Sequence, residues 1–94
     1  MIQYTPRPID TNHILLPTEL HPLIEKLAEN NHEEWSHRRM KDGWVYGAQR
    51  CDEKKHHPCL IPYEELPESE KEYDRISALA TVKLLLVLGY KITS

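Results

Sequence analysis

The positions of the prolines set the strongest limit on what this chain can fold into. There are seven prolines in 94 residues. Proline fixes φ and has no backbone N–H, so it is excluded from helix interiors but tolerated in a first helical turn. Only two stretches are therefore long enough for a substantial helix. One begins near Pro22 and ends well before Pro58, and the other follows Pro67.

Residues 1–19 are expected to form an extended lead-in. Their three prolines disfavour helix and favour polyproline-like or sheet-edge conformations. Ile14, Leu15 and Leu16 are the apolar residues expected to anchor this segment to the core.

Residues 20–39 are predicted to form the first principal helix, because apolar side chains recur there at helical spacing. The resulting stripe consists of Leu20, Leu23, Ile24, Leu27, Ala28, Asn31 and Trp35. Two starts remain open: Thr18 as the N-cap, or His21 as the cap with Pro22 at the first helical position. Asp42-Gly43 is expected to end the helix.

Residues 67–88 are predicted to form the second principal helix. Pro67 and the acidic residues after it suit a helix start, where the macrodipole favours negative charge, and Gly89 suits the position after the helix end. The run from Leu84 to Leu88 is apolar all round. This pattern predicts cover on more than one side of the helix.

Short strands and a loop are expected over residues 43–63, with a further short strand at 90–92. In the candidate strand between Gly43 and Gly47, alternation would place Trp44 and Tyr46 on one face, and both are expected in the core. Residues 48–57 are polar and predicted to be a loop, and residues 59–61 to be extended. The predicted fold is one domain over residues 1–94, mainly α with small β, built on two principal antiparallel helices.

The net charge, the composition and the length of the apolar runs argue against several classes of function. The net charge of −3 and the balanced composition do not favour binding to nucleic acid. The longest apolar run is far shorter than the ~20 residues needed to span a bilayer, and no signal peptide is visible. We expect a cytoplasmic protein that does not enter a membrane, with Cys51 and Cys59 reduced.

Aromatic and basic residues form the most suggestive chemical pattern. His32, Trp35 and Arg38 follow one another by single helical turns and so share a face. An indole offers a stacking surface for a base, and arginine offers a planar fork for phosphate. The alternative is that Trp35 packs in the core and that the basic residues between 37 and 57 form a solvated face.

Metal binding and catalysis are not expected. Cys51, His56, His57 and Cys59 are zinc-ligand residue types, but their spacing is not a recognised ligand pattern. The three glycines are scattered, so no phosphate-binding loop is present. No nucleophile is followed by an identifiable base and orienting group. We expect neither a metal nor a cofactor.

At the level of motifs, the chain resembles the repeat that occurs in pairs in the cytoplasmic part of ryanodine receptor calcium channels, and also in bacterial and phage proteins. The residues that carry the resemblance are Tyr4-x-Pro6-x-Pro8-x-Asp10-Thr11, Leu27-Ala28-Glu29-Asn30, His32-Glu33-x-Trp35, Gly43-Trp44-x-Tyr46-Gly47, His57-Pro58-Cys59-Leu60, Pro62-Tyr63, Leu66-Pro67-Glu68-x-Glu70-x-x-Tyr73 and Leu88-Gly89-Tyr90. A single copy is similar to the free-standing bacterial or phage form.

The resemblance implies a ligand cleft and self-association. In the channels, the residues matching His32 and Trp35 line a cleft between the two paired repeats that can hold an adenine nucleotide or a related ligand, and the position matching Asp74 lies near that cleft. A homodimer would reproduce that pairing with identical copies.

Two functions follow as hypotheses. The first is a ligand sensor that stacks a nucleotide-like molecule on Trp35 and meets its phosphates with Arg38 or Arg39. The second is a protein-interaction or scaffold module in which Trp35 is structural.

Overall fold

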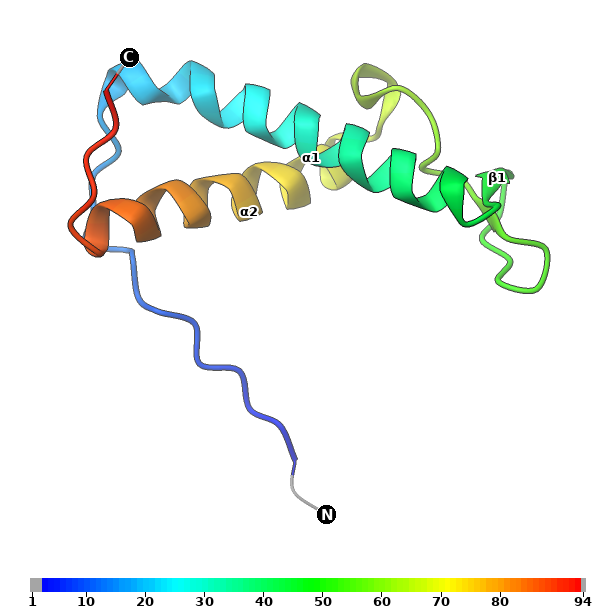
Figure 1. Ribbon diagram of the computed structural model, residues 1–94, viewed down its shortest axis with the longest axis horizontal. Helices are drawn as coiled ribbons and strands as arrows, with labels where there is room; N and C mark the ends of the chain where they lie inside the picture. Colours follow the sequence, from blue (N-terminus) through cyan, green and yellow to red (C-terminus); the bar gives the residue numbers. More distant parts are fainter. Residues whose placement is uncertain (1–2, 94) are drawn as a thin grey trace.

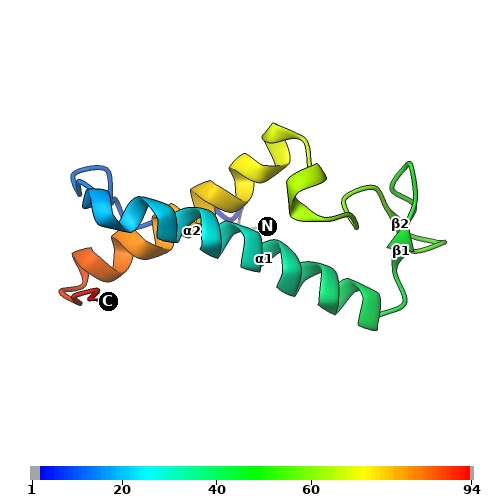
Figure 2. The ribbon, with the colours of Figure 1, turned by 90° about the horizontal axis from the view of Figure 1, so that it is seen from above.

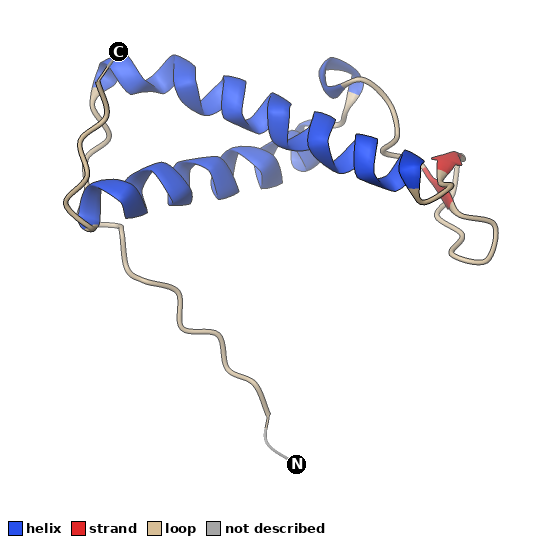
Figure 3. Cartoon of the chain, viewed as in Figure 1, coloured by secondary structure: helices blue, strands red, loops and turns tan. Residues whose placement is uncertain are grey.

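The computed structural model of the chain describes residues 3–93. In chain order it contains the 3₁₀ turn η1 (Thr18–Leu20), helix α1 (His21–Lys41), strands β1 (Val45–Tyr46) and β2 (His56–His57), the 3₁₀ turn η2 (Tyr63–Glu65) and helix α2 (Glu68–Val87). The predicted class, mainly α with small β, is confirmed (Figure 3). The two long helices run in opposite directions and cross obliquely, as the two views in Figure 1 and Figure 2 show.

Helix α1 begins as a continuation of η1 and has no side-chain cap. The His21 N–H bonds to the Thr18 carbonyl, so the turn of η1 leads directly into the helix. Neither predicted N-cap is observed, because neither Thr18 nor His21 caps the start of α1 with its side chain and the cap position is Leu20. Pro22 does lie in the first helical turn, where its missing N–H leaves no hydrogen bond unmade.

Both helices end in a Schellman turn around a glycine with positive φ. The φ angles of Gly43 and Gly89 are 92° and 93°, a region that glycine enters without steric cost. At the end of α1 the Trp44 N–H bonds to the Arg39 carbonyl at 3.0 Å, and Tyr90 makes the equivalent bond at the end of α2. The first of these turns folds Trp44 back toward the last turn of α1.

The sheet consists of two short parallel strands, in which Val45 pairs with His56 and Tyr46 with His57. The prediction of a loop throughout residues 48–57 is therefore wrong at its end, because β2 forms there. Gly47 allows the close approach, since a Cβ atom at this position would lie 2.5 Å from the His56 Cβ.

Two other strand-region predictions need correction. Trp44 is buried as expected, but Tyr46 is 57% exposed, and Val45 beside it on β1 is exposed as well. Residues 90–92 do not form a strand. They follow the end of α2, at the opposite end of the molecule from the sheet, so no strand is available to pair with them (Figure 1).

The core is small and centres on Ala28 of α1, packed with Tyr63 and Leu66. Cys59 and Ile61 pack against the same cluster. The segment that leads from β2 to α2 therefore lies against α1. The apolar stripe of α1 predicts that one face of this helix is buried, but it does not predict that the segment between β2 and α2 covers that face.

The predicted apolar stripe of α1 is buried or half-buried except at one position, where His32 replaces Asn31. Asn31 is exposed, whereas His32 is only 4% exposed. The reason is that Nε2 of His32 lies 2.7 Å from the carbonyl oxygen of Ile61 and donates a hydrogen bond to it. A buried polar side chain needs such a partner, and the segment beside α1 supplies it.

An ion-paired arginine joins the two helices. Arg75 of α2 donates through Nε to Glu25 of α1 at 2.8 Å and through Nη1 to Glu68 at 3.0 Å. The hydroxyl of Tyr63 donates to the same Glu25 carboxylate at 3.0 Å. Burial, with the hydrogen bond to Glu25, raises the pKa of Tyr63 to about 12.

The lead-in is anchored by two of its three predicted residues. Ile14 and Leu16 are half-buried and share a hollow with Ile24 and Leu79, whereas Leu15 is 91% exposed. The chain before them extends away from the two helices, as Figure 1 shows.

The apolar end of α2 is only partly covered. Leu85 is 38% exposed and Leu88, at the end of the helix, is 58% exposed, because α1 packs against one side of α2 alone. Within residues 3–93, neither helix is long and apolar enough to cross a bilayer.

Candidate functional site

A cavity of about 230 Å³ lies where α1, the segment after β2 and α2 meet. His32 and Trp35 line it from α1, and Glu70, Tyr73 and Asp74 line it from α2. The remaining lining residues, His57, Cys59 and Leu66, lie between the two helices in the sequence. The cavity thus combines aromatic rings and carboxylates from three separate parts of the chain.

The indole of Trp35 is half-buried at the edge of this cavity. The His32 ring stacks on it with centroids 5.6 Å apart and planes inclined by 26°. The His57 ring meets it edge-on, at 4.9 Å and 76°. These two contacts hold the indole in one orientation while part of it stays accessible from the cavity.

Arg39 is held between two indoles. Its guanidinium carbon lies 5.6 Å from the centroid of the Trp35 ring and 4.8 Å from that of the Trp44 ring. Trp35 is one turn earlier on α1, whereas Trp44 is brought back by the Schellman turn at Gly43. In the part of the chain that the structure describes, no carboxylate forms an ion pair with Arg39.

His57 lies between charges of opposite sign. Burial lowers its pKa, the nearby positive charges of Arg50 and Arg39 lower it further, and Glu70 opposes them. Nδ1 of His57 accepts a hydrogen bond from the Cys59 N–H at 3.0 Å. At neutral pH the ring is therefore uncharged and its Nε2 carries the proton.

The α2 wall of the cavity is acidic. Glu70 and Asp74 are one helical turn apart, so both carboxylates lie on one side of α2. Burial raises the pKa of Asp74, and Glu70 adds to this effect while His32 opposes it. Burial and the same two carboxylates raise the pKa of the Cys59 thiol, which is therefore unsuited to act as a thiolate nucleophile.

Three of the five predicted site residues, His32, Trp35 and Asp74, line the same cavity although Asp74 is distant in sequence. Arg39 contacts the Trp35 ring from outside the cavity lining. Arg38, which the sequence placed on the same face as His32 and Trp35, is exposed, and the described cation–π contacts to Trp35 and Trp44 come from Arg39 instead.

Sequence reasoning missed the contributions of His57, Glu70 and Trp44. The position of Trp44 beside the last turn of α1 could have been predicted, because the residue two positions after the C-cap commonly contacts the last turn of its helix. Here Gly43 marks such a turn. Glu70 shares a helix face with Asp74 and could have been found from that spacing. His57 stood out only as part of the family motif, and its contact with Trp35 could not be predicted because it depends on pairing between β1 and β2.

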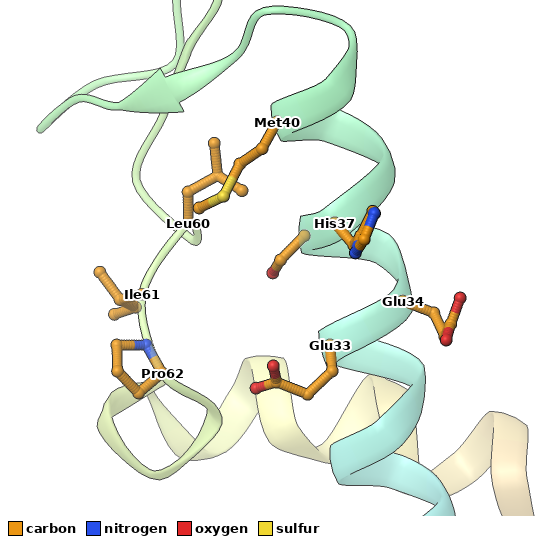
Figure 4. A pocket seen from close by; sticks show the side chains of 8 residues that line it. Glu33, Glu34, His37, Met40, Leu60, Ile61 and Pro62 are labelled. Carbon is orange, nitrogen blue, oxygen red and sulfur yellow. The ribbon is translucent and has the colours of Figure 1, made fainter.

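A second, larger hollow of about 470 Å³ lies on another side of α1. Figure 4 shows Glu33 and Met40 reaching toward Leu60, Ile61 and Pro62 across it. Its wall is mixed, with polar side chains from α1 facing the apolar residues Leu60, Ile61 and Pro62, and it is open to solvent.

The cysteines do not assemble a metal site with their neighbours. Cys51 and Cys59 are both free thiols. Among the described residues 3–93, no three His, Cys, Asp or Glu side chains are grouped as metal ligands.

One model of a known protein family matches the part of the chain that forms the cavity. The family model described as the RyR domain matches residues 4–94, which is nearly the entire chain and includes every residue of the cavity. The chain therefore belongs to the RyR domain family.

Proposed function

We propose that this protein is a non-enzymatic binding module that holds a nucleotide-like small molecule beside Trp35, with Arg39 binding its phosphates. The observation that carries the proposal is the environment of Arg39. Its guanidinium is oriented by Trp35 and Trp44, yet it has no carboxylate partner among the described residues. A pre-oriented arginine without a counter-ion retains its hydrogen-bond donors for an anion.

The cavity beside Trp35 suits the base of such a ligand. Stacking of a base on an aromatic side chain is worth about 1–3 kcal/mol. Trp35 presents part of its ring to the cavity, and His32 and His57 keep that ring from rotating. In this proposal a planar ring contacts the part of the indole that lines the cavity, beside the His32 ring already stacked on it, without the cost of reorganising the indole.

Arg39, rather than Arg38, is the phosphate-binding residue in this proposal. The sequence left both open, but only Arg39 contacts the ring that the base would stack on. Arg38 is exposed, and among the described residues the cation–π contacts with Trp35 and Trp44 belong to Arg39, so Arg38 serves as a matched control.

The test is to titrate the full chain with ATP and to measure binding by isothermal titration calorimetry and by tryptophan fluorescence. Binding by the wild type, a loss of about 10-fold or more in Arg39→Ala, and little change in Arg38→Ala are expected. Trp35→Ala should abolish binding while leaving the helical circular dichroism unchanged. Absence of any ATP binding by the folded wild type, up to millimolar concentration, would overturn the proposal.

The second candidate is an interaction module that pairs with a copy of itself, and it rests on the exposed surface. The chain of 11.1 kDa exposes 7782 Å², whereas a compact protein of that mass exposes roughly 5,700 Å². Its radius of gyration is 16.3 Å, against about 12 Å for a compact domain of this length. Part of the excess belongs to the lead-in that extends away from the helices (Figure 1). The total excess is larger than the ~800 Å² that each partner buries in a standard interface.

The apolar end of α2 is where a second copy would pack in this candidate function. Burying Leu85 and Leu88 would remove partly exposed apolar side chains at the end of α2 from water. Light scattering at high micromolar concentration should show a dimer, and Leu88→Glu should shift it to a monomer. Val45→Glu, at an exposed position on β1, is the control. A wild type that is strictly monomeric at these concentrations would refute self-association and leave docking of a different protein as the form of the scaffold function.

A further inference from the structure

The hollow of about 470 Å³ on α1, named here the α1 groove, has one polar side and one apolar side. Figure 4 shows the Glu33 side chain reaching from α1 toward residues 60–62 on the facing segment. Met40 of α1, which is 56% exposed, adds to the apolar surface. Among the described residues, Glu33 forms no ion pair. The α1 groove therefore suits a segment that brings apolar side chains and a positive charge.

The chain itself carries a segment of this composition. Residues 3–10 form an arm that extends away from the two helices (Figure 1), and all of them are exposed. Tyr4 and Ile9 of the arm are 83% and 59% exposed. Arg7 stands between two prolines, and no carboxylate in the part of the chain that the structure describes forms an ion pair with it. In this position the arm can bury its apolar side chains only against another molecule.

The prolines of the arm favour a conformation that fits the two-sided groove. Proline fixes φ close to its value in polyproline II, where three residues complete a turn and side chains three apart share an edge. Pro6 and Ile9 then share an apolar edge, and Arg7 lies on the next edge. Along the α1 groove, the apolar edge would contact residues 60–62 while Arg7 meets Glu33. Because the arm is already extended, it loses little conformational entropy on binding.

The exposed area of the chain favours a second copy as the source of the arm. The chain exposes 7782 Å², which is roughly 2,000 Å² more than a compact protein of its mass. Two-fold exchange would place two arms in two grooves, so each copy would bury its arm and also cover its groove. The ~800 Å² that each partner buries in a standard interface lies well within this excess.

We propose that the arm of one copy binds in the α1 groove of a second copy, with Arg7 paired to Glu33 of the partner subunit. Pro6 and Ile9 pack on the apolar side of that groove. The proposal does not depend on nucleotide binding, because the α1 groove and the cavity beside Trp35 are lined by different residues. It also uses a surface other than the apolar end of α2.

The experiment measures dimerisation of the full chain by sedimentation velocity up to high micromolar concentration. The wild type should dimerise, and Arg7→Glu and Glu33→Arg should each weaken dimerisation about 10-fold or more, since each puts like charges together at two symmetric contacts. The double variant exchanges the two charges and should return dimerisation to the wild-type level. Glu29→Arg makes the same change in charge at an exposed position on α1, one turn before Glu33 and outside the groove lining, and should have no effect.

The outcomes distinguish arm exchange from other forms of association. A strictly monomeric wild type would overturn the proposal. Dissociation by Leu88→Glu but by neither charge reversal would place the interface at the end of α2 and would also overturn it. A double variant no stronger than the single variants would show that Arg7 and Glu33 do not meet, and an equal loss in Glu29→Arg would assign the effect to net charge; either result refutes the proposal. Circular dichroism establishes that each variant is folded.

Discussion

Replacement of Arg39 by alanine should destabilise the protein by about 1–2 kcal/mol. Arg39 makes cation–π contacts with two indoles, at 5.6 Å and 4.8 Å from the ring centroids. Each such contact at a partly exposed site contributes about 0.5–1 kcal/mol. For a domain of 60–100 residues, 1 kcal/mol corresponds to about 4–8 °C in Tm, so a decrease of roughly 5–15 °C is expected.

The neighbouring arginine provides a close control for this measurement. Arg38→Ala removes the same charge from the same last turn of α1, so it changes the helix macrodipole and the helix propensity in the same way. Arg38 is exposed and contacts neither indole, and its replacement should stay within about 0.5 kcal/mol of the wild type. Arg39→Met keeps an unbranched apolar chain against the rings but removes the cation.

Urea denaturation followed by circular dichroism gives the free energy of unfolding of all four proteins. The expected order of stability is wild type and Arg38→Ala together, then Arg39→Met, then Arg39→Ala. If Arg39→Ala were as stable as Arg38→Ala, the two indoles would not hold the guanidinium in solution. If Arg39→Met matched the wild type, the contact would be one of apolar packing and the charge would contribute nothing.

Three further predictions concern stability. Gly47→Ala should cost about 1–3 kcal/mol, because the new Cβ would lie 2.5 Å from that of His56; thermal denaturation measures the loss, and an unchanged Tm would contradict it. Tyr63→Phe should cost about 1 kcal/mol at neutral pH by removing the hydrogen bond to Glu25. Since hydrogen bonds from Arg75 and Tyr63 lower the pKa of Glu25, this contribution is present above the ordinary glutamate pKa of about 4.3 and is lost as the pH falls through the lower folded value; a gap that persists to pH 2 in urea titrations would refute the assignment. Asp74→Asn should raise Tm at pH 7, because burial raises the Asp74 pKa and so disfavours its charged form in the fold; the gain should disappear as the pH falls below about 3.9, where the wild-type carboxyl is protonated in both states, and a gain independent of pH would contradict this cause.

The local elements of this protein are determined by residues close together in the sequence. Prolines exclude helix from the lead-in and from the segment before Pro67, and Gly43 and Gly89 end the two helices where they were expected to end them. Turn formation, helix interruption and helix termination depend on the φ angle and N–H of individual residues. For this reason the helices, their order and the fold class could be predicted without coordinates.

The sequence predicted which residues lie together in the site only where those residues share a helix. His32, Trp35 and Arg39 succeed one another along α1, so their proximity follows from the helical repeat. Asp74 was predicted only through the resemblance to the family. The spacing of residues in the sequence gives no reason to place Asp74 near α1. The sequence could not decide whether Arg38 or Arg39 faces Trp35.

The tertiary structure decided which of these residues meet and which face of α1 is buried. His32 rather than Asn31 is inside, because the Ile61 carbonyl reaches its ring, and His57 reaches Trp35 because β2 pairs with β1. Asp74 lies opposite because the two helices cross. Each of these contacts joins segments that are far apart in the sequence, and their positions depend on the packing of the whole chain rather than on the preferences of any one segment.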